Sequence, residues 1–523
     1  MIKKIFLSVG LCSLAVLGFS QNMVDAYRLS NVHMQGTARA TAMGNAFGAL
    51  GGDFTSASIN PAGIGMYMSD ELEMTMQVGN YKNQASYLGS NTDASNNNFS
   101  IPNLGYVVSL KTDPRKNSSL VSVNLGIGYN RMSNFNTNTV IRGNGATSSM
   151  LDQFVENATT GYASDFYEGV AAGAGAIYQY ADPETGDYTG PYYHDMQKVQ
   201  DGYPSENFAH DQKKTIYQSG SLDEYIFSLA FNFNHKLYFG ATFGIQNVNF
   251  EESSTMYEGN VDYEGHRESG EYNSYLNEYG FNQYLETWGT GLNAKFGLIY
   301  KPIKQLRLGL AVHTPTYYRL HDSYSTYMYN DYDLANTSGG YNNYTDEAYS
   351  DSYGAYDYQI NSPMKAILSA AYVIGKRASI SVDYEYLNYD KMKLKNGGDG
   401  YNFDYENTDV QNTFKSVGNL HVGGEYRVTN ALSLRGGYEY LESPYETNGW
   451  QGATQTYSAG IGYRFGRYYI DAAYKHIGTS SKLQLYDMPL GVVNKGYDEV
   501  VTSPIAKMNY KRNLYTVTLG MRF

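Results

Sequence analysis

Residues 377–389 read Arg-Ala-Ser-Ile-Ser-Val-Asp-Tyr-Glu-Tyr-Leu-Asn-Tyr, with an apolar or aromatic side chain at every second position. In an extended strand Ile380 and Val382 fall on one face, whereas Ser381 and Asp383 fall on the other. A strand of this kind needs an apolar partner for one face only. The stretch therefore predicts a half-polar β-strand.

The same alternation recurs over about fourteen segments after residue 69, for example over 121–130 and 237–246. Repeated over hundreds of residues, it predicts either a very large sandwich or a membrane barrel with lipid outside and water or a plug inside. The expected strands span 70–88, 103–112, 119–133, 222–235, 236–250, 285–301, 304–320, 356–374, 377–392, 413–427, 430–443, 454–466, 467–480 and 511–523.

The connections between these segments differ in length. Every second one is a tight turn, as at Asn234-His235, Gly375-Lys376 and Gly466-Arg467. The intervening long connections span 134–221, 251–284, 321–355, 393–412 and 481–510. Short turns at one end and long loops at the other are typical of an outer-membrane barrel with periplasmic turns and extracellular loops, and a soluble sandwich has no reason to sort its loops in this way. The sequence therefore predicts an all-β, antiparallel transmembrane barrel over 69–523.

The first twenty residues resemble a secretory signal: basic Lys3 and Lys4, an apolar run and small Ser20. Cys12, the one cysteine, lies in this segment, so we expect a mature chain without disulfides or thiolate chemistry. The formal net charge of −13 argues against nucleic-acid binding. No nucleophile elbow, zinc-protease motif or phosphate loop occurs, so we predict no enzyme activity, no cofactor and no metal.

Residues 21–68 do not alternate. They are rich in small residues, which suits a segment packed inside a confined lumen, and Asn60-Pro61-Ala62 favours a turn. We expect this turn to brace the segment against the barrel wall near Gly126 and Gly128. The chain ends on an alternating strand whose terminal aromatic, Phe523, resembles the signal read by the barrel assembly machinery.

The chain resembles the FadL/TodX family of outer-membrane transport proteins. The resemblance rests on Asn60-Pro61-Ala62 in a glycine- and alanine-rich N-terminal segment, on 296–302 and 306–315, and on glycine-rich runs in 423–463. It implies a barrel of about fourteen strands plugged by an N-terminal hatch (21–68), in the outer membrane of a Gram-negative bacterium. It also implies passive uptake of long-chain fatty acids or other hydrophobic compounds, by extracellular capture, hatch movement and lateral exit through the wall.

Two sets of residues are candidates for these steps. Gly126 and Gly128 face the lumen in the third strand, where missing side chains favour weak pairing and a lateral gate, although glycines are common in barrel strands. Apolar residues at helical spacing in the first long loop form either a capture groove or a cluster that covers the barrel mouth. They are Met150, Leu151, Phe154, Val155, Phe166 and Val170.

A second function is compatible with the sequence. The 55 tyrosines crowd into strand ends and into loops such as 324–358. Tyrosine-rich loops offer stacking faces at low entropic cost, so a surface receptor or adhesin that binds glycan or haem is the alternative to a transporter. In either case we expect a monomer in contact with outer-membrane lipid.

Overall fold

A computed structural model describes residues 23–113, 119–180, 185–188, 190–200, 203–263, 274–350, 353–375, 377–447, 449–486 and 504–523. The predicted signal segment lies outside these residues, as does much of the expected loop 481–510. The helices are α1 (Met23–Ser30), α2 (Ala38–Ala42), α3 (Ser56–Ile59), η1 (Pro61–Met66), α4 (Met150–Thr160), α5 (Glu168–Gly173), η2 (Tyr389–Lys391) and α7 (Asp404–Thr413). Among the described residues, no helix is long and apolar enough to cross a bilayer.

The strands form one antiparallel barrel with two small side sheets. The barrel strands are β1 (Glu71–Tyr87), β2 (Ser90–Lys111), β3 (Leu120–Asn134), β4 (Thr137–Ala146), β9 (Ala209–Phe233), β10 (Leu237–Asp262), β11 (Ser274–Tyr300), β12 (Leu306–His313), β13 (Tyr317–Ala335), β14 (Tyr341–Tyr349), β15 (Gly354–Asn361), β16 (Lys365–Ile374), β17 (Ala378–Asn388), β18 (Lys393–Asn396), β19 (Ser416–Arg427), β20 (Leu432–Leu441), β21 (Thr454–Phe465), β22 (Tyr468–Gln484) and β23 (Ile505–Arg522). The side sheets pair β5 (Tyr178–Gln179) with β6 (Tyr192–Tyr193) and β7 (Gln197–Gln200) with β8 (Tyr203–Asn207).

The predicted fourteen-stranded barrel is confirmed. Four pairs of elements are halves of one interrupted strand, because both members follow the same neighbouring strand: β3 with β4, β12 with β13, β15 with β16, and β17 with β18. Among the described residues β14 pairs with β13 alone, as the return strand of a hairpin, so it is not counted as a separate strand of the barrel. The first strand pairs with the last, from Glu71↔Arg522 to Ser86↔Lys507, and this pairing closes the barrel.

The predicted lipid face is exposed on the outside of the barrel. Ile380 is 51% exposed, whereas Ser381 next to it is fully buried on the lumen side. Exposed aromatic side chains border the apolar belt at both ends, for example Tyr300 and Tyr426 near the turns and Trp288 near the loops. An apolar belt between two aromatic girdles is the surface of a transmembrane β-barrel, which excludes the soluble sandwich.

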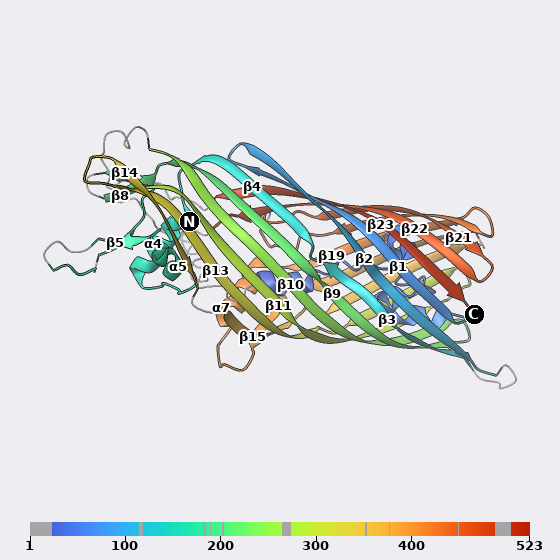
Figure 1. Cartoon of the computed structure of the whole chain (residues 1–523). Coiled ribbons are helices and arrows are strands. Elements are labelled where there is room, and N and C mark those ends of the chain that lie inside the picture. Colours follow the sequence, from blue (N-terminus) through green and yellow to red (C-terminus); the bar gives the residue numbers. More distant parts are fainter. Residues whose placement is uncertain are drawn as a thin grey trace, which may run out of the picture.

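The strands near the loop end are longer than the sequence predicts. Much of the expected loop 251–284 is strand, because β10 continues to Asp262 and β11 begins at Ser274. Likewise β2 begins at Ser90, after a two-residue turn in which Leu88 and Gly89 both have positive φ. Above the membrane the outward face is polar and the inner face mixes apolar residues, such as Met256, with polar ones, such as Glu258, so no regular apolar alternation marks these extensions. Strands β9 to β13 form a tall wall that rises past the others toward α4 and α5 (Figure 1).

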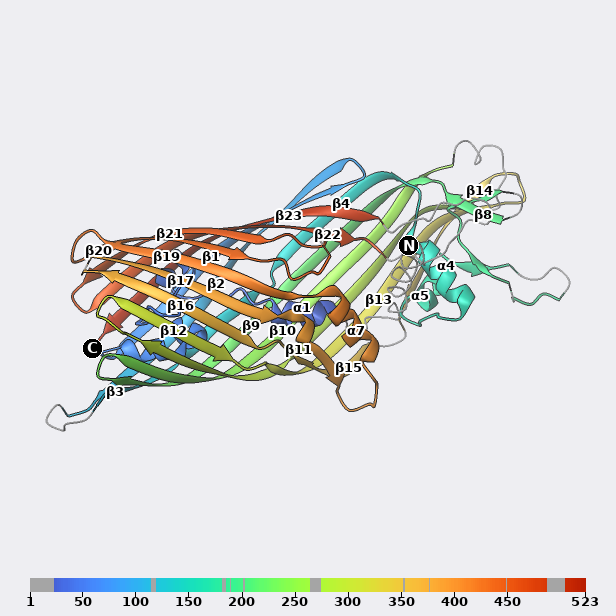
Figure 2. The same ribbon diagram turned by 180° about the vertical axis from the view of Figure 1, so that it is seen from behind.

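The N-terminal segment fills the lumen. Figure 2 shows α1 beside α7 near the loop end, whereas the rest of the segment lies deeper in the barrel, toward the C-terminus. Small side chains allow this fit, since Ala38, Ala40 and Ala42 of α2 have no exposed surface. We call the described residues 23–68 the hatch.

Candidate functional site: a plugged lumen with two cavities

Asn60 attaches the hatch to the barrel wall. Its Oδ1 accepts a hydrogen bond from the backbone N–H of Ala62 at 3.1 Å, which caps η1. Its Nδ2 donates to the carbonyls of Gly48 at 2.6 Å and of Leu298, on β11, at 3.3 Å. This single buried side chain therefore fixes the turn, the hatch interior and the wall together.

The turn does not lie where the sequence predicted. Asn60-Pro61-Ala62 contacts Gly240 on β10 and Gly297 on β11, and not Gly126 and Gly128 on β3. The expected contact is wrong because β10 and β11 each carry a lumen-facing glycine that leaves room for the turn backbone.

Gly126 and Gly128 receive a different part of the hatch. The ring of Phe54 fills the space beside Gly128 and lies 3.6 Å from the position of a Cβ atom at Gly126. Phe54 has no exposed surface. The two glycines do face the lumen, but β3 is paired on both sides at both positions, so the expected weak pairing is wrong. Phe54 is a site residue that sequence reasoning missed, and its position beside the hatch motif was the only signal for it.

Charged side chains hold the hatch at the turn end of the lumen. Arg39 Nε lies 3.0 Å from Glu425 Oε2, and Arg435 Nε lies 2.7 Å from the same oxygen. Arg435 Nη1 also lies 2.5 Å from Asp471. Because one carboxylate joins an arginine of the hatch to an arginine of the wall, movement of the hatch must break this network.

A central cavity lies between α1 and the deeper part of the hatch, with an empty volume of about 1410 Å³ including open solvent. Its loop-side lining is largely apolar, with Leu29, Met132, Tyr318, Leu387 and Tyr389. The space that the centres of water-sized spheres can occupy is about 150 Å³, which corresponds to roughly ten such groups. The cavity therefore has room for part of an extended alkyl chain while the hatch is in place.

The hatch-side lining of the central cavity is charged. A polar ring surrounds the lumen there, formed by Glu224, Lys295, His313, Lys365, Glu385, His421, Glu439 and Lys475. Its members are neighbours in the barrel register, as in Lys295↔His313↔Lys365. The lysines pair with carboxylates: Nζ–O distances are 2.5 Å to Glu224, 2.8 Å to Glu385 and 2.8 Å to Glu439. The cavity thus has an apolar part and an ionic part.

A side cavity lies next to the central one, with an empty volume of about 900 Å³ including open solvent. Asn31, His33 and Met34 of the hatch line both cavities. His33 belongs to the hatch and not to a membrane-spanning strand, and its burial, with the charges of Arg512 and Lys475, lowers its pKa to about 4. A neutral imidazole therefore separates the two cavities.

The side cavity reaches a weak place in the barrel wall. The pairing of β2 with β3 ends at Asn103↔Asn130, and beyond it residues 90–100 pair only with β1. No backbone pairing crosses this seam in the described residues, but side chains bridge it: Asn134 Nδ2 donates to Asn98 Oδ1 at 2.9 Å, and Thr92 Oγ1 donates to the carbonyl of Val140 on β4 at 2.5 Å. We call it the β2–β3 seam. Pro102 lies where β2 leaves the ladder, and a proline inside an alternating strand was the signal that sequence reasoning missed.

The hatch also pairs with β3 beside this seam. The register of β3 against β9 shifts between Arg131 and Ser133, and the carbonyl of Arg131 accepts a hydrogen bond from the N–H of Gln35 at 3.0 Å. Hatch and seam are therefore coupled through the backbone.

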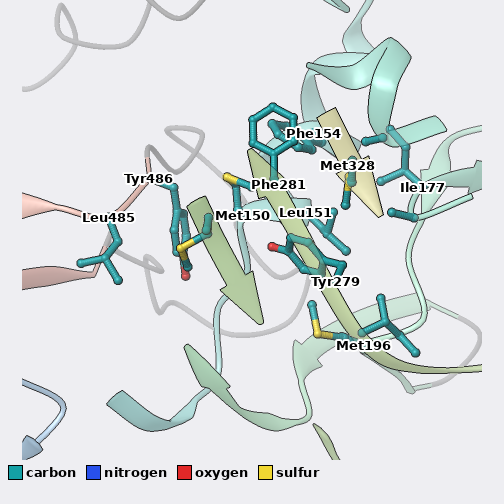
Figure 3. Close-up of a cluster of buried hydrophobic side chains, with 14 of the residues drawn as sticks. Met150, Leu151, Phe154, Ile177, Met196, Tyr279, Phe281, Met328, Leu485 and Tyr486 are labelled. Atoms are coloured by element: carbon teal, nitrogen blue, oxygen red, sulfur yellow. The ribbon is translucent and has the colours of Figure 1, made fainter. Parts of the chain in front are cut away.

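The apolar residues of the first long loop form a buried cluster and not an open groove (Figure 3). Leu151, Phe154 and Val170 are at most 2% exposed, Met150 is 7% exposed, and Val155 packs against the cluster. Phe166 is half-buried beside Tyr324, with ring centroids 4.7 Å apart. The expected capture groove is wrong for these residues, because tall strands such as β11, which carries Phe281, cover their apolar face.

Phe523 lies at the turn end of the barrel. Its side chain is 55% exposed, and its N–H donates to the carbonyl of Asp70 at 3.0 Å. The terminal strand β23 is therefore paired with β1 and β22, and the role of Phe523 in assembly stays a prediction.

Together these features define a class of protein: an outer-membrane β-barrel whose lumen is plugged by its own N-terminal segment. No protein-family model and no curated protein sequence matches the chain. A solved FadL homologue from Pseudomonas aeruginosa matches 94% of this chain and 99% of its own, at 14% identity and a TM-score of 0.53. The toluene transporters TodX of Pseudomonas putida and TbuX of Ralstonia pickettii match with TM-scores of 0.46 and 0.45, at 13% and 14% identity, each over 93% of this chain and 98% of their own. The match to the FadL homologue confirms the predicted resemblance for the fold.

Proposed function

We propose that the chain is an outer-membrane channel for the passive uptake of hydrophobic compounds, with long-chain fatty acids or similar amphipathic molecules as its cargo. The observation that carries this proposal is the central cavity, which lies inside a plugged barrel and joins an apolar part to an ionic part. A receptor or adhesin has no need of an internal cavity sealed by a hatch.

The polar ring supports an amphipathic cargo. An alkyl chain placed in the apolar part gains free energy from burial at about 25 cal/mol per Å². A carboxylate at the other end of the molecule meets Lys365, Lys475 or the hydrogen-bonding groups beside them. A plain hydrocarbon gains nothing from the ring, since buried ionic groups stabilise polar partners only.

The coupling between hatch and seam supports a lateral exit. Withdrawal of Gln35 from Arg131 frees the irregular part of β3 next to the side cavity. The cargo then passes from the central cavity around His33 to the β2–β3 seam. In this proposal the lateral gate lies at Arg131–Ser133 and at the β2–β3 seam. Gly126 and Gly128 form the part of the wall against which Phe54 packs.

A disulfide tether tests hatch movement. The position of a Cβ atom at Gly126 lies 3.8 Å from Ile64 Cγ2, so side chains at these two positions face each other across the contact between hatch and wall. In the Ile64→Cys/Gly126→Cys variant, oxidation should abolish oleate uptake and reduction should restore it. The matched control is Asn80→Cys/Asn97→Cys, a cross-strand pair on the exposed outer face of β1 and β2. Full uptake through the verified cross-linked hatch would disprove the proposal.

A second cross-link tests the exit route. Cysteines at Asn98 and Asn134, joined by a short bifunctional reagent, would close the β2–β3 seam without touching the hatch. Loss of uptake with unchanged oleate binding supports lateral exit. Unchanged uptake favours an axial channel.

A further inference from the structure

The tall wall presents a surface directly above the lipid belt. Tyr225 on β9, Trp288 on β11 and Tyr317 on β13 mark the outer aromatic girdle, each more than 40% exposed. On β11 the strand from Trp288 to Glu278 rises roughly 25 Å above this girdle, given 3.3 Å per residue and a strand tilt of about 40°. The wall is visible in Figure 1 as the green and yellow strands near β10, β11 and β13.

The outward positions of this wall change character above the girdle. Below it they are apolar, as at Leu292 and Phe296, and above it they are tyrosine, amide, hydroxyl and carboxylate side chains. We call these residues the upper outer face. It comprises Thr255 and Tyr257 on β10, Glu278, Asn282 and Tyr284 on β11, Tyr327 and Tyr329 on β13, and Tyr349 on β14, all half-exposed or exposed.

Side-chain contacts across the strands hold this face in one arrangement. Thr255 Oγ1 donates to Asn282 Oδ1 at 2.6 Å, and Tyr257 OH donates to Glu278 Oε2 at 2.7 Å. The rings of Tyr327 and Tyr349 lie 4.5 Å apart between centroids. A preordered surface loses little conformational entropy when it binds a ligand.

A second contact flattens the face at its centre. Gly280, on the same outward side of β11, has no side chain, and the ring of Tyr329 covers the place where a Cβ atom would stand. The ring therefore lies along the sheet and presents a face to the outside. Such a ring offers apolar area for the C–H face of a sugar, and its hydroxyl offers a hydrogen bond.

The charge of the wall selects among saccharides. The outward positions above the girdle carry acidic Glu251, Glu278, Glu286, Asp331 and Glu347 against basic Lys213 and Arg319. Carboxylates accept hydrogen bonds from sugar hydroxyls, but they repel phosphate groups. The face therefore suits uncharged sugar units.

We propose that the upper outer face binds the uncharged sugars of the glycolipid in the outer leaflet of the outer membrane. The occupant follows from position: the face continues the lipid-facing surface on the same strands, so the sugars of the molecules that border the belt lie against it. This interaction does not depend on which cargo crosses the barrel.

The test uses full-length protein in nanodiscs that contain one of two glycolipids: one with its complete neutral hexose core, and one truncated before the hexoses but still phosphorylated. The readout is glycolipid retained per protein after detergent extraction. Tyr257→Ser/Tyr329→Ser should lower retention of the complete form at least threefold and leave the truncated form unchanged. The matched control, Tyr405→Ser, removes a 75% exposed tyrosine of α7 and should change neither.

Two checks keep the test decisive. Heat-modifiable gel mobility verifies that each variant is folded, and Glu278→Gln, which retains the shape of the face, replaces the double variant if folding fails. Unchanged retention, or an equal loss of the truncated form, overturns the proposal, since the latter shows phosphate recognition. Binding of the soluble hexose core with the same affinity in lipid-free detergent overturns it in favour of a receptor for free glycans.

Discussion

The ring of Phe54 in the hatch occupies the place that a side chain at Gly128 would need on β3. This contact joins residues that are far apart in the sequence, and it packs the hatch against the lumen side of β3. A side chain added at Gly128 would therefore press directly on the hatch.

We predict that Gly128→Val displaces Phe54 and loosens the hatch. Overpacking of this kind costs about 1–3 kcal/mol. The added Cβ would overlap both the Phe54 ring and the carbonyl oxygen of Leu104 on β2, so we expect the ring to move out and the β2–β3 backbone to shift locally. Single-channel conductance in planar bilayers should rise. Gly126→Ala is the control, because its added Cβ meets its nearest neighbour, Ser228, at an ordinary 3.4 Å. Equal conductance of the two variants would contradict the prediction.

The ion pair between Lys475 and Glu439 should behave as a unit. Lys475→Met alone leaves a buried carboxylate and should lower the free energy of unfolding by about 3–5 kcal/mol, whereas Lys475→Met/Glu439→Met should be close to neutral. The double variant should still take up less oleate, because the polar ring has lost two groups. Denaturant titration and labelled-oleate uptake measure the two effects. An additive double-mutant cycle would show that the pair is not coupled.

Adjacent residues on opposite faces of β17 should respond differently to lysine. Ile380→Lys places a charge in lipid and should lower the free energy of refolding into vesicles by about 2–4 kcal/mol. Ser381 is fully buried on the lumen side, which the hatch fills, so Ser381→Lys should displace the hatch and raise conductance. If Ser381→Lys lowered the free energy of refolding and left conductance unchanged, Ser381 would pack within the barrel wall and would not contact the hatch, which would contradict the prediction.

Phe154 should act as a core residue of the loop region and not as a ligand contact. It is 2% exposed, so Phe154→Ala should cost about 3–5 kcal/mol of local stability and increase proteolysis of α4 and α5. Phe166→Ala, at a half-buried position, should cost less. Limited proteolysis with mass spectrometry measures both. If Phe154→Ala lost fatty-acid binding without faster proteolysis, Phe154 would belong to a capture groove for the fatty acid, as the sequence had suggested.

Alternation alone predicted the barrel. Ile380 and Ser381 differ in exposure as their places in the sequence require, because lipid and lumen impose different polarity on the two faces of a strand. Helical spacing likewise predicted α4 around Met150, where Ser149 and Asp152 form a capping box. These signals are local, so they could be read without any knowledge of neighbouring strands.

The site could be predicted only in part. Asn60-Pro61-Ala62 marked the hatch, but not its seat on Gly240 and Gly297, since many lumen-facing glycines could accept a backbone turn. The apolar residues of the first loop were found, but not whether another element covers them. The height of the wall was missed because its outward face is polar and its inner face mixes apolar residues such as Phe281 with polar ones such as Glu258, so no regular apolar period marks it.

The sequence by itself determined the strand faces, the barrel class and the plug, because each depends on the solvent or the residue sizes that a segment meets. Only the tertiary structure decided where Phe54 and Asn60 rest, where β2 and β3 part, and how eight side chains meet in the polar ring. These depend on the register of strands distant in sequence, and barrel closure fixes that register through all fourteen strands at once.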